Sequence, residues 1–182
     1  LYAGTICGVY KSIDGGENWF EVNNGLPVVS VRVLSIDPAT PTTLFAGVSC
    51  YGVYKSVDGA DSWTFSNTGL PDYACVSWLA IDPIAPTNVY AGIRNSSVDL
   101  YKSTNAGETW IPAHAGLPTY GNSVVSLGID PVTPTTLYAG TDNSGIFKST
   151  NGGVSWEAAN NGLTATNIQA LAINPTTPGT PP

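Results

Sequence analysis

The sequence predicts an all-β protein of four tandem repeats, each of which folds into a four-stranded antiparallel sheet. Three observations lead to this prediction. The same short motifs return about every 45 residues, the length of one such sheet with its turns. The motif segments are rich in β-branched and aromatic residues and are bounded by Gly, Pro, Asn and Asp, as strands and turns are. Nowhere do apolar residues recur with helical spacing.

Four tryptophans set the register of the repeats. Each belongs to the same series of segments: Tyr-Ala-Gly, then Tyr-Lys-Ser, then the tryptophan, then Gly-Leu-Pro and Ile-Asp-Pro, with small variations such as Gly-Leu-Thr in the last copy. The tryptophans are Trp19, Trp63, Trp110 and Trp156. We expect one domain over 1–174 with repeats at about 1–37, 38–82, 83–130 and 131–174, and a Pro/Thr-rich linker or tail over 175–182.

The expected strands are short, and several are apolar on both faces. Examples are 31–36, 44–48, 52–56 and 63–66. Strands with two apolar faces fit sheets that pack against neighbouring sheets, as the blades of a β-propeller do. The order expected within a blade begins at an innermost strand such as 31–36 and ends at the tryptophan strand.

The residues that end in each tryptophan resemble the Asp box, Ser/Thr-x-Asp-x-Gly-x-Thr-Trp, of the BNR-repeat β-propeller superfamily. That superfamily includes sialidases, xyloglucan-degrading glycosidases, sortilin-type receptors and photosystem-assembly propellers, so the resemblance implies a fold and no single function. It also implies that the box is a structural turn on the face away from the usual active site. The matching residues are Ser12, Asp14, Gly16, Trp19, Ser56, Asp58, Trp63, Ser103, Asn105, Gly107, Trp110, Ser149, Asn151, Gly153 and Trp156.

The chemistry of the box agrees with a structural role. The side-chain oxygen of Asp14 or its counterparts accepts backbone N–H bonds, Gly supplies positive φ, and Trp packs between blades. Asn105 and Asn151 keep an acceptor oxygen. Ala60 stands where the other boxes have Gly, so the second turn is expected to be strained or reshaped.

In this register the first strand is the second of its blade, and Ile168–Ile173 is an innermost strand at the other end. We expect this strand to complete the N-terminal blade. It does so either within the chain, closing a four-bladed ring, or in a neighbouring subunit by β-augmentation. A third alternative is that the repeats form part of a larger ring. Self-association through strand completion is therefore one expected interaction.

Composition excludes several functions. The formal net charge is −7, with 6 basic and 13 acidic residues, so the basic surface that nucleic acids or anionic membranes require is missing. No apolar run predicts a membrane-spanning helix. No metal, phosphate-loop or nucleotide motif predicts a cofactor. Arg32 and Arg94 are the only arginines, too few for the three-arginine site of the sialidases.

The candidate site residues lie in the loops of the expected ligand-facing side. Asp72 and Asp142 are weak catalytic candidates, since glycoside hydrolysis requires two facing carboxylates. Tyr51, Tyr73 and Tyr120 are ligand-contact candidates because exposed aromatic rings stack on sugars and anchor protein partners. Trp78, within an innermost strand, is expected to pack between blades.

Three cysteines and one sequon point to an extracellular protein. A disulfide Cys50–Cys75 or Cys7–Cys50 could join neighbouring blades, with three reduced thiols as the alternative. Asn95 begins a possible N-glycosylation sequon. The sequence as a whole predicts a non-enzymatic extracellular or cell-surface module that builds an assembly or binds a carbohydrate or protein. The alternative is a fragment of a xyloglucanase-like glycoside hydrolase.

Overall fold

The computed structural model describes residues 1–94, 100–118 and 123–174, and the secondary structure assigned in them is entirely β. Four antiparallel sheets follow one another along the chain, the first with three strands and the others with four. Each strand pairs with its neighbour in sequence, so every sheet is a meander. None of the described residues forms a helix long and apolar enough to span a membrane.

The strands of each sheet run from the innermost to the outermost in chain order, and the first sheet begins at the second position. The first sheet contains β1 (Tyr2–Thr5), β2 (Gly8–Lys11) and β3 (Phe20–Glu21). The second contains β4 (Val31–Ile36), β5 (Leu44–Val48), β6 (Gly52–Ser56) and β7 (Thr64–Phe65). The third contains β8 (Val76–Ile81), β9 (Val89–Ile93), β10 (Leu100–Ser103) and β11 (Ile111–Pro112). The fourth contains β12 (Val124–Ile129), β13 (Leu137–Thr141), β14 (Ile146–Ser149) and β15 (Glu157–Ala158).

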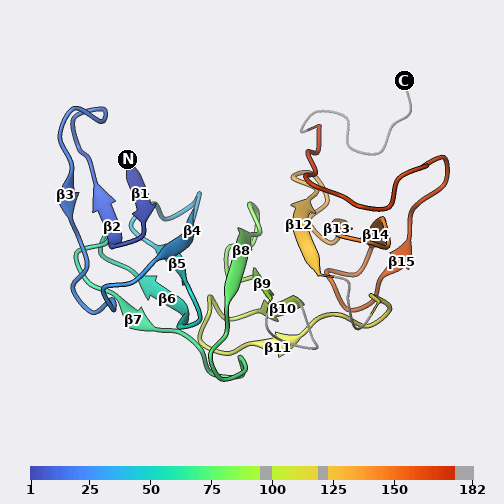
Figure 1. Cartoon of the computed structure of the whole chain (residues 1–182), viewed down its shortest axis with the longest axis horizontal. Coiled ribbons are helices and arrows are strands. Elements are labelled where there is room, and N and C mark those ends of the chain that lie inside the picture. Colours follow the sequence, from blue (N-terminus) through green and yellow to red (C-terminus); the bar gives the residue numbers. More distant parts are fainter. Residues whose placement is uncertain (95–99, 119–122, 175–182) are drawn as a thin grey trace.

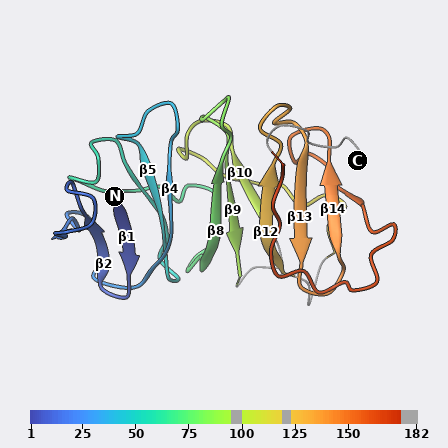
Figure 2. The same cartoon turned by 90° about the horizontal axis from the view of Figure 1, so that it is seen from above.

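The four sheets stand side by side along an open arc (Figure 1). The innermost strands β4, β8 and β12 line the concave side, and the short outermost strands β3, β7, β11 and β15 lie on the convex side. Figure 2 shows the same succession from above, with the first and fourth sheets at opposite ends. The sheets resemble propeller blades, but the two ends of the arc do not meet.

The segment 159–174 differs from its expected structure. We expected Ile168–Ile173 to be a strand, yet no strand is assigned there. The segment nevertheless lies where the innermost strand of a following sheet would lie. A β-carbon at Gly140 would come within 2.6 Å of Ile168, as one at Gly47 would come within 2.7 Å of Val76. It remains irregular because a strand requires a pairing partner, and the candidate partner β1 lies at the other end of the arc.

The core is divided into three clusters, each lying between two adjacent sheets. The second strands of the middle sheets, β5 and β9, are buried along their whole length. This burial explains why these strands carry apolar residues on both faces. By contrast, β1 has an exposed Gly4 where its counterparts Gly47 and Gly92 are buried, because no innermost strand covers it.

The Asp boxes close their turns with the same two contacts in all four repeats. In the first, the backbone N–H of Gly16 donates to Ser12 Oγ at 2.8 Å and that of Asn18 donates to Asp14 Oδ1 at 2.9 Å. In the fourth, where Asn replaces Asp, the corresponding donors are Gly153 and Ser155, at 2.9 and 3.0 Å. The acceptor oxygen, and not the charge, is therefore what the turn requires.

The two aspartate boxes hold their carboxylates ionised. Backbone and side-chain hydrogen bonds from Asn18, followed by one from Ser12, lower the pKa of Asp14 to about 2. The Ser62 hydroxyl, with the Ser62 backbone and Ser56, lowers the pKa of Asp58 to about 2. In both cases the hydrogen bonds favour the charged form.

Ala60 keeps the turn geometry of the glycine that it replaces. Its φ is 72°, and its N–H still donates to Ser56 Oγ at 2.9 Å. The turn is thus conserved in shape, with an L-residue in the left-handed region. Ala106, in the third box, also has positive φ, at 55°.

The same two kinds of hydrogen bond, one from a tryptophan and one from a lysine, connect each sheet to the one before it, and we call this pair of contacts the joint. The indole N–H of the box tryptophan donates to a carbonyl of the preceding sheet at 2.8–2.9 Å: Trp63 to Val22, Trp110 to Ser66 and Trp156 to Ala113. In the opposite direction a lysine of each earlier sheet donates to a box carbonyl of the next: Lys11 to Gly59, Lys55 to Ala106 and Lys102 to Gly152. The tryptophan and lysine of the motif are therefore scaffold residues.

Candidate functional site

A hollow of about 610 Å³, lined in part by aromatic side chains, lies beside the second sheet. Two loops at one end of this sheet form it together with Phe65 of β7, one loop between β5 and β6 and one between β7 and β8. Its lining residues are Cys50, Tyr51, Phe65, Asn67, Leu70, Pro71, Asp72, Tyr73 and Ala74. We call it the aromatic pocket below. It unites Tyr51 and Tyr73 with Asp72, all three of which the sequence singled out.

Three covalent or hydrogen-bonded links hold the two loops together. A disulfide joins Cys50 to Cys75, so of the two pairings that the sequence left open the structure contains this one. The Gly52 N–H donates to the Ala74 carbonyl at 2.9 Å. The Asn67 side chain receives the Val53 N–H at 2.6 Å and donates to the Tyr51 carbonyl at 2.9 Å. Cys7 is a free, exposed thiol.

The aromatic rings of the pocket are unusually exposed. Tyr73 is 80% exposed, Phe65 66% and Tyr51 51%. Phe65 stands edge-on to Tyr54, with ring centroids 5.4 Å apart, which fixes the orientation of one wall. Both Cys50 and Tyr73 have positive φ, at 54° and 57°, so the backbone itself adopts an uncommon conformation on each side.

Phe65 is a site residue that the sequence analysis missed, because it lies in the expected tryptophan strand. A signal was present in the repeat. The register places Phe65 opposite Tyr54, at the position that Glu21, Pro112 and Ala158 hold in the other sheets. Because only one repeat has an aromatic residue at this position, the repeat fold does not require it, and the residue is a candidate for another role.

The carboxylates of the described chain mostly have structural partners. Asp37, Asp82 and Asp130 are buried, and each accepts two backbone N–H bonds from the turn that follows an innermost strand. Asp142 accepts the Ser123 N–H at 2.8 Å, which anchors its own loop. Asp142 does not line the aromatic pocket with Asp72, so the two catalytic candidates are not brought together there.

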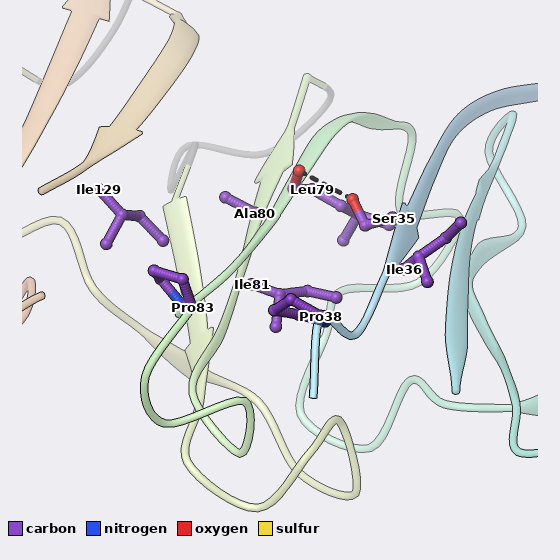
Figure 3. Close-up of a pocket in the computed structure, with 8 residues that line it drawn as sticks. All are labelled: Ser35, Ile36, Pro38, Leu79, Ala80, Ile81, Pro83 and Ile129. Atoms are coloured by element: carbon purple, nitrogen blue, oxygen red, sulfur yellow. Dashed lines mark hydrogen bonds between the residues drawn. The ribbon is translucent and has the colours of Figure 1, made fainter. Parts of the chain in front are cut away.

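A second hollow, of about 380 Å³, lies where the innermost strands β4, β8 and β12 end (Figure 3). It is lined by aliphatic side chains, Pro38, Pro83 and Ser35. Ser35 is occupied, because its hydroxyl donates to the Leu79 carbonyl at 3.1 Å. With no acid, base or cation in its lining, this hollow offers apolar surface alone.

Trp78 occupies the same concave side as a packing residue. Its indole N–H donates to the Val124 carbonyl at 2.7 Å, which links the third and fourth sheets. Tyr120 and Asn95 lie outside the described residues. Within the described ranges no cluster of three or more His, Cys, Asp or Glu residues has the geometry of a metal site.

The fold has counterparts among solved structures, whereas no protein-family model and no curated protein matches the chain. An ancestral GH74 enzyme superposes with a TM-score of 0.68 at 24% identity, over 85% of this chain and 22% of that one. The GH74 enzyme of Niastella koreensis superposes with a TM-score of 0.70 at 21% identity, over 86% of this chain and 27% of that one. YCF48 bound to D1 peptide superposes with a TM-score of 0.67 at 17% identity, over 96% and 55%.

These likenesses concern the fold alone, because every identity is below 25%. The chain spans only 22% to 55% of the length of these structures. The chain is thus similar in structure to part of the β-propellers of GH74 enzymes, one of them a xyloglucanase from Xanthomonas campestris, and of YCF48.

Proposed function

We propose that this chain is a non-enzymatic, extracellular propeller module that binds a carbohydrate in the aromatic pocket. The single observation that carries the proposal is the set of three exposed aromatic rings around one hollow of about 610 Å³. Exposed aromatic faces of this size are costly in water unless a ligand covers them, and sugar rings stack on such faces. The cross-linked loops hold the rings in place, which lowers the entropy that binding must overcome.

The absence of a facing acid pair in the pocket supports a binding role rather than hydrolysis. Asp72 is the only carboxylate among the residues that line it. The two-carboxylate mechanism needs a second one within about 5–10 Å. The alternative is that the chain is part of a glycoside hydrolase, and the structural likeness to GH74 enzymes supports it.

Binding of a neutral oligosaccharide to the full chain tests the proposal. Xyloglucan oligosaccharides, titrated by calorimetry, are expected to bind, and Tyr51→Ala and Tyr73→Ala are each expected to weaken binding about tenfold, since each removes one stacking face. Phe20→Ala is the matched control, because Phe20 is 57% exposed but lies on the first sheet outside the pocket.

Three results would count against the binding role. Undetectable binding of the sugar, or equal losses with Phe20→Ala, would contradict it. Release of reducing ends from xyloglucan, abolished by Asp72→Ala or Asp142→Ala, would replace it with the hydrolase alternative.

Assembly through the ends of the arc is a second candidate function, which the repeated joint favours. At one end Trp19 is 41% exposed, and its indole N–H bonds within its own turn to Gly16. At the other end Ala159 is exposed, whereas its counterparts Ser66 and Ala113 are buried acceptors of a tryptophan. The two ends therefore carry the two halves of the joint that is formed three times inside the chain.

The backbone at the two ends is complementary as well. β1 offers an uncovered edge, and the segment 166–173 is held against the fourth sheet by bonds from the Gly145 N–H to the Thr166 carbonyl and from the Ile168 N–H to the Thr141 carbonyl. A second copy that brings its β1 beside this segment completes a four-stranded sheet by strand addition. Such head-to-tail contacts give a ring if they close and a filament if they do not.

The particle mass in solution tests this assembly. Light scattering is expected to give more than the 18.9 kDa of one chain at high concentration. Trp19→Ala is expected to shift the distribution toward monomer, because it removes the indole that enters the joint, whereas Ile111→Ala, an exposed residue on the convex side, leaves it unchanged. A monomer at all accessible concentrations would refute the proposal.

An extracellular location is part of the same proposal. The Cys50–Cys75 disulfide supports it, because disulfides persist in oxidising compartments and are rare in the cytosol.

A further inference from the structure

The six basic residues of the chain divide into two groups with different structural roles. All four lysines belong to the repeated Tyr-Lys-Ser or Phe-Lys-Ser motif. Three of them donate to a box carbonyl of the next sheet, and Lys148, at the end of the array, lies over the Tyr138 ring at 5.6 Å. The lysines are thus accounted for by the scaffold, and only Arg32 and Arg94 remain.

Neither arginine occupies a position that the repeat requires. The position of Arg32 is held by Ser77 and Val125 in the next two sheets, and the position of Arg94, directly after the second strand, is held by Ser49 and Asp142. Since the other sheets form without a cation at these positions, folding does not explain the two arginines.

A β-bulge directs Arg32 away from the regular pleat. The pairing of β4 with β5 skips from Val31 to Val33, which leaves Arg32 as the extra residue, and β8 and β12 have the same irregularity at Ser77 and Val125. Bulges bend a strand locally and re-aim the side chain of the extra residue. Here all three extra residues line the same hollow.

The two arginines meet in that hollow, which has a volume of about 470 Å³ and which we call the arginine pocket. It is lined by Arg32, Ser49, Cys50, Cys75, Val76, Ser77, Arg94 and Val125. Arg32 Nε donates to Ser49 Oγ at 3.2 Å, which orients the guanidinium. The backbone N–H of Arg94 donates to the Cys75 carbonyl at 3.0 Å, which fixes the base of that side chain.

Neither guanidinium group forms an ion pair with a carboxylate among the described residues. The ion pair that the described residues form is Lys11–Asp61, on the first two sheets, so no described carboxylate neutralises either arginine. The side chains of Arg32 and Arg94 are exposed. The Ser77 hydroxyl donates to the Gly92 carbonyl at 3.2 Å, whereas the Ser49 hydroxyl accepts from Arg32. Two guanidinium groups beside the Ser49 hydroxyl suit a carboxylate, because guanidinium donors match its planar oxygens.

The arginine pocket adjoins the aromatic pocket, since Cys50 lines both, and its disulfide partner Cys75 lines the arginine pocket. We propose that the two pockets form one extended site for a uronic acid-containing oligosaccharide, with one sugar ring on Tyr51 or Tyr73 and a neighbouring carboxylate between Arg32 and Arg94. This inference rests on the proposed carbohydrate binding and specifies the chemistry of its ligand.

The charge of the whole chain limits the ligand further. A formal charge of −7 repels dense polyanions, so the attraction comes from the two guanidinium groups at short range. A short oligosaccharide with one carboxylate per ring fits two guanidinium groups on an acidic protein better than a nucleic acid does, because a duplex carries one phosphate about every 1.7 Å. Because the groups are exposed, salt is expected to weaken the interaction.

The test compares trigalacturonate with its fully methyl-esterified form, which has the same rings without the charges. Calorimetry on the full chain at low salt is expected to show that the acid form binds about tenfold more tightly, the usual effect of one charged hydrogen-bonded contact. Arg32→Gln and Arg94→Gln are each expected to remove this difference while the ester binds as before. Lys148→Gln, measured below the concentration of self-association, makes the same change in net charge outside the pocket and is expected to preserve it.

The outcomes separate this inference from the carbohydrate proposal on which it rests. If both forms bind equally, or if Lys148→Gln has the same effect as the arginine variants, the uronate specificity is refuted and the aromatic pocket retains its role. If neither form binds and the neutral xyloglucan oligosaccharides also fail, both proposals fall. Thermal unfolding of the arginine variants, which change exposed side chains, should match that of the parent chain and so exclude misfolding.

Discussion

Replacement of Trp110 by alanine is expected to lower the free energy of unfolding by about 3–5 kcal/mol, as for other buried large aromatic residues. Trp110 is 2% exposed and packs in the cluster between the second and third sheets. Its indole N–H also donates to the Ser66 carbonyl at 2.8 Å, and that buried acceptor loses its partner in the variant. Urea unfolding followed by circular dichroism measures the loss.

Trp19→Ala is the matched control, because it removes the same side chain from the same motif at the end of the arc. Trp19 is 41% exposed and bonds only to its own turn, so a loss of about 1 kcal/mol or less is expected at a protein concentration too low for self-association. Equal losses for the two variants would contradict the conclusion that the tryptophan stabilises the chain through the joint between sheets.

Removal of the Cys50–Cys75 disulfide is the second large expected effect. The double variant Cys50→Ala/Cys75→Ala is expected to lose about 2–4 kcal/mol of stability, since the bond closes a loop with a sequence separation of 25 residues and so restricts the unfolded chain. The same variant is expected to bind saccharide more weakly, because the disulfide ties together the two loops that carry Tyr51 and Tyr73.

Cys7→Ala is the control for the loss of a cysteine. Cys7 is exposed and unpaired, so its replacement should leave the unfolding transition unchanged. Thiol labelling of the oxidised, denatured protein without reductant should detect one cysteine per chain. Labelling of three thiols, or a double variant as stable as the parent, would show that the cross-link does not contribute to the fold in solution.

Local patterns predicted the sheets well. The four-strand order, the strand positions and the box turns all follow from hydrogen bonds and side-chain alternation within a few residues, so the repeat carries them. Gly16 and its counterparts show this directly, since the turn closes on its own Ser and Asp or Asn. Ala60 shows that the hydrogen bonds hold the turn even when the residue is not Gly.

The segment Ile168–Ile173 shows a feature that local sequence patterns do not predict, namely whether an expected strand finds a pairing partner. Its sequence is that of an innermost strand, and it lies in the place of one, but a strand also requires an edge to pair with. Whether that edge is present depends on the curvature of the whole array and on the neighbouring sheet that supplies the edge, and no pattern within the segment encodes either of them.

The candidate site was predicted only in part. Tyr51, Tyr73 and Asp72 were recognised as loop residues, and the structure adds Phe65 as a further aromatic wall. In the sequence, Arg32 and Arg94 were only noted as too few for the three-arginine site of the sialidases. Their positions 62 residues apart gave no sign that they share a hollow. Both were visible as departures from the repeat, which is the signal that a residue serves something other than the scaffold.

The sequence by itself determined the four sheets, the turns that close them and the tryptophan that packs between them, because each of these rests on a motif repeated at a fixed spacing. The lysine contacts between sheets were found only in the structure. Only the tertiary structure decided that Arg32 and Arg94 share a hollow, that this hollow adjoins the aromatic pocket at Cys50, and that the arc stays open. These features depend on the bulges in the innermost strands and on the angle between neighbouring sheets, which bring together residues from different repeats.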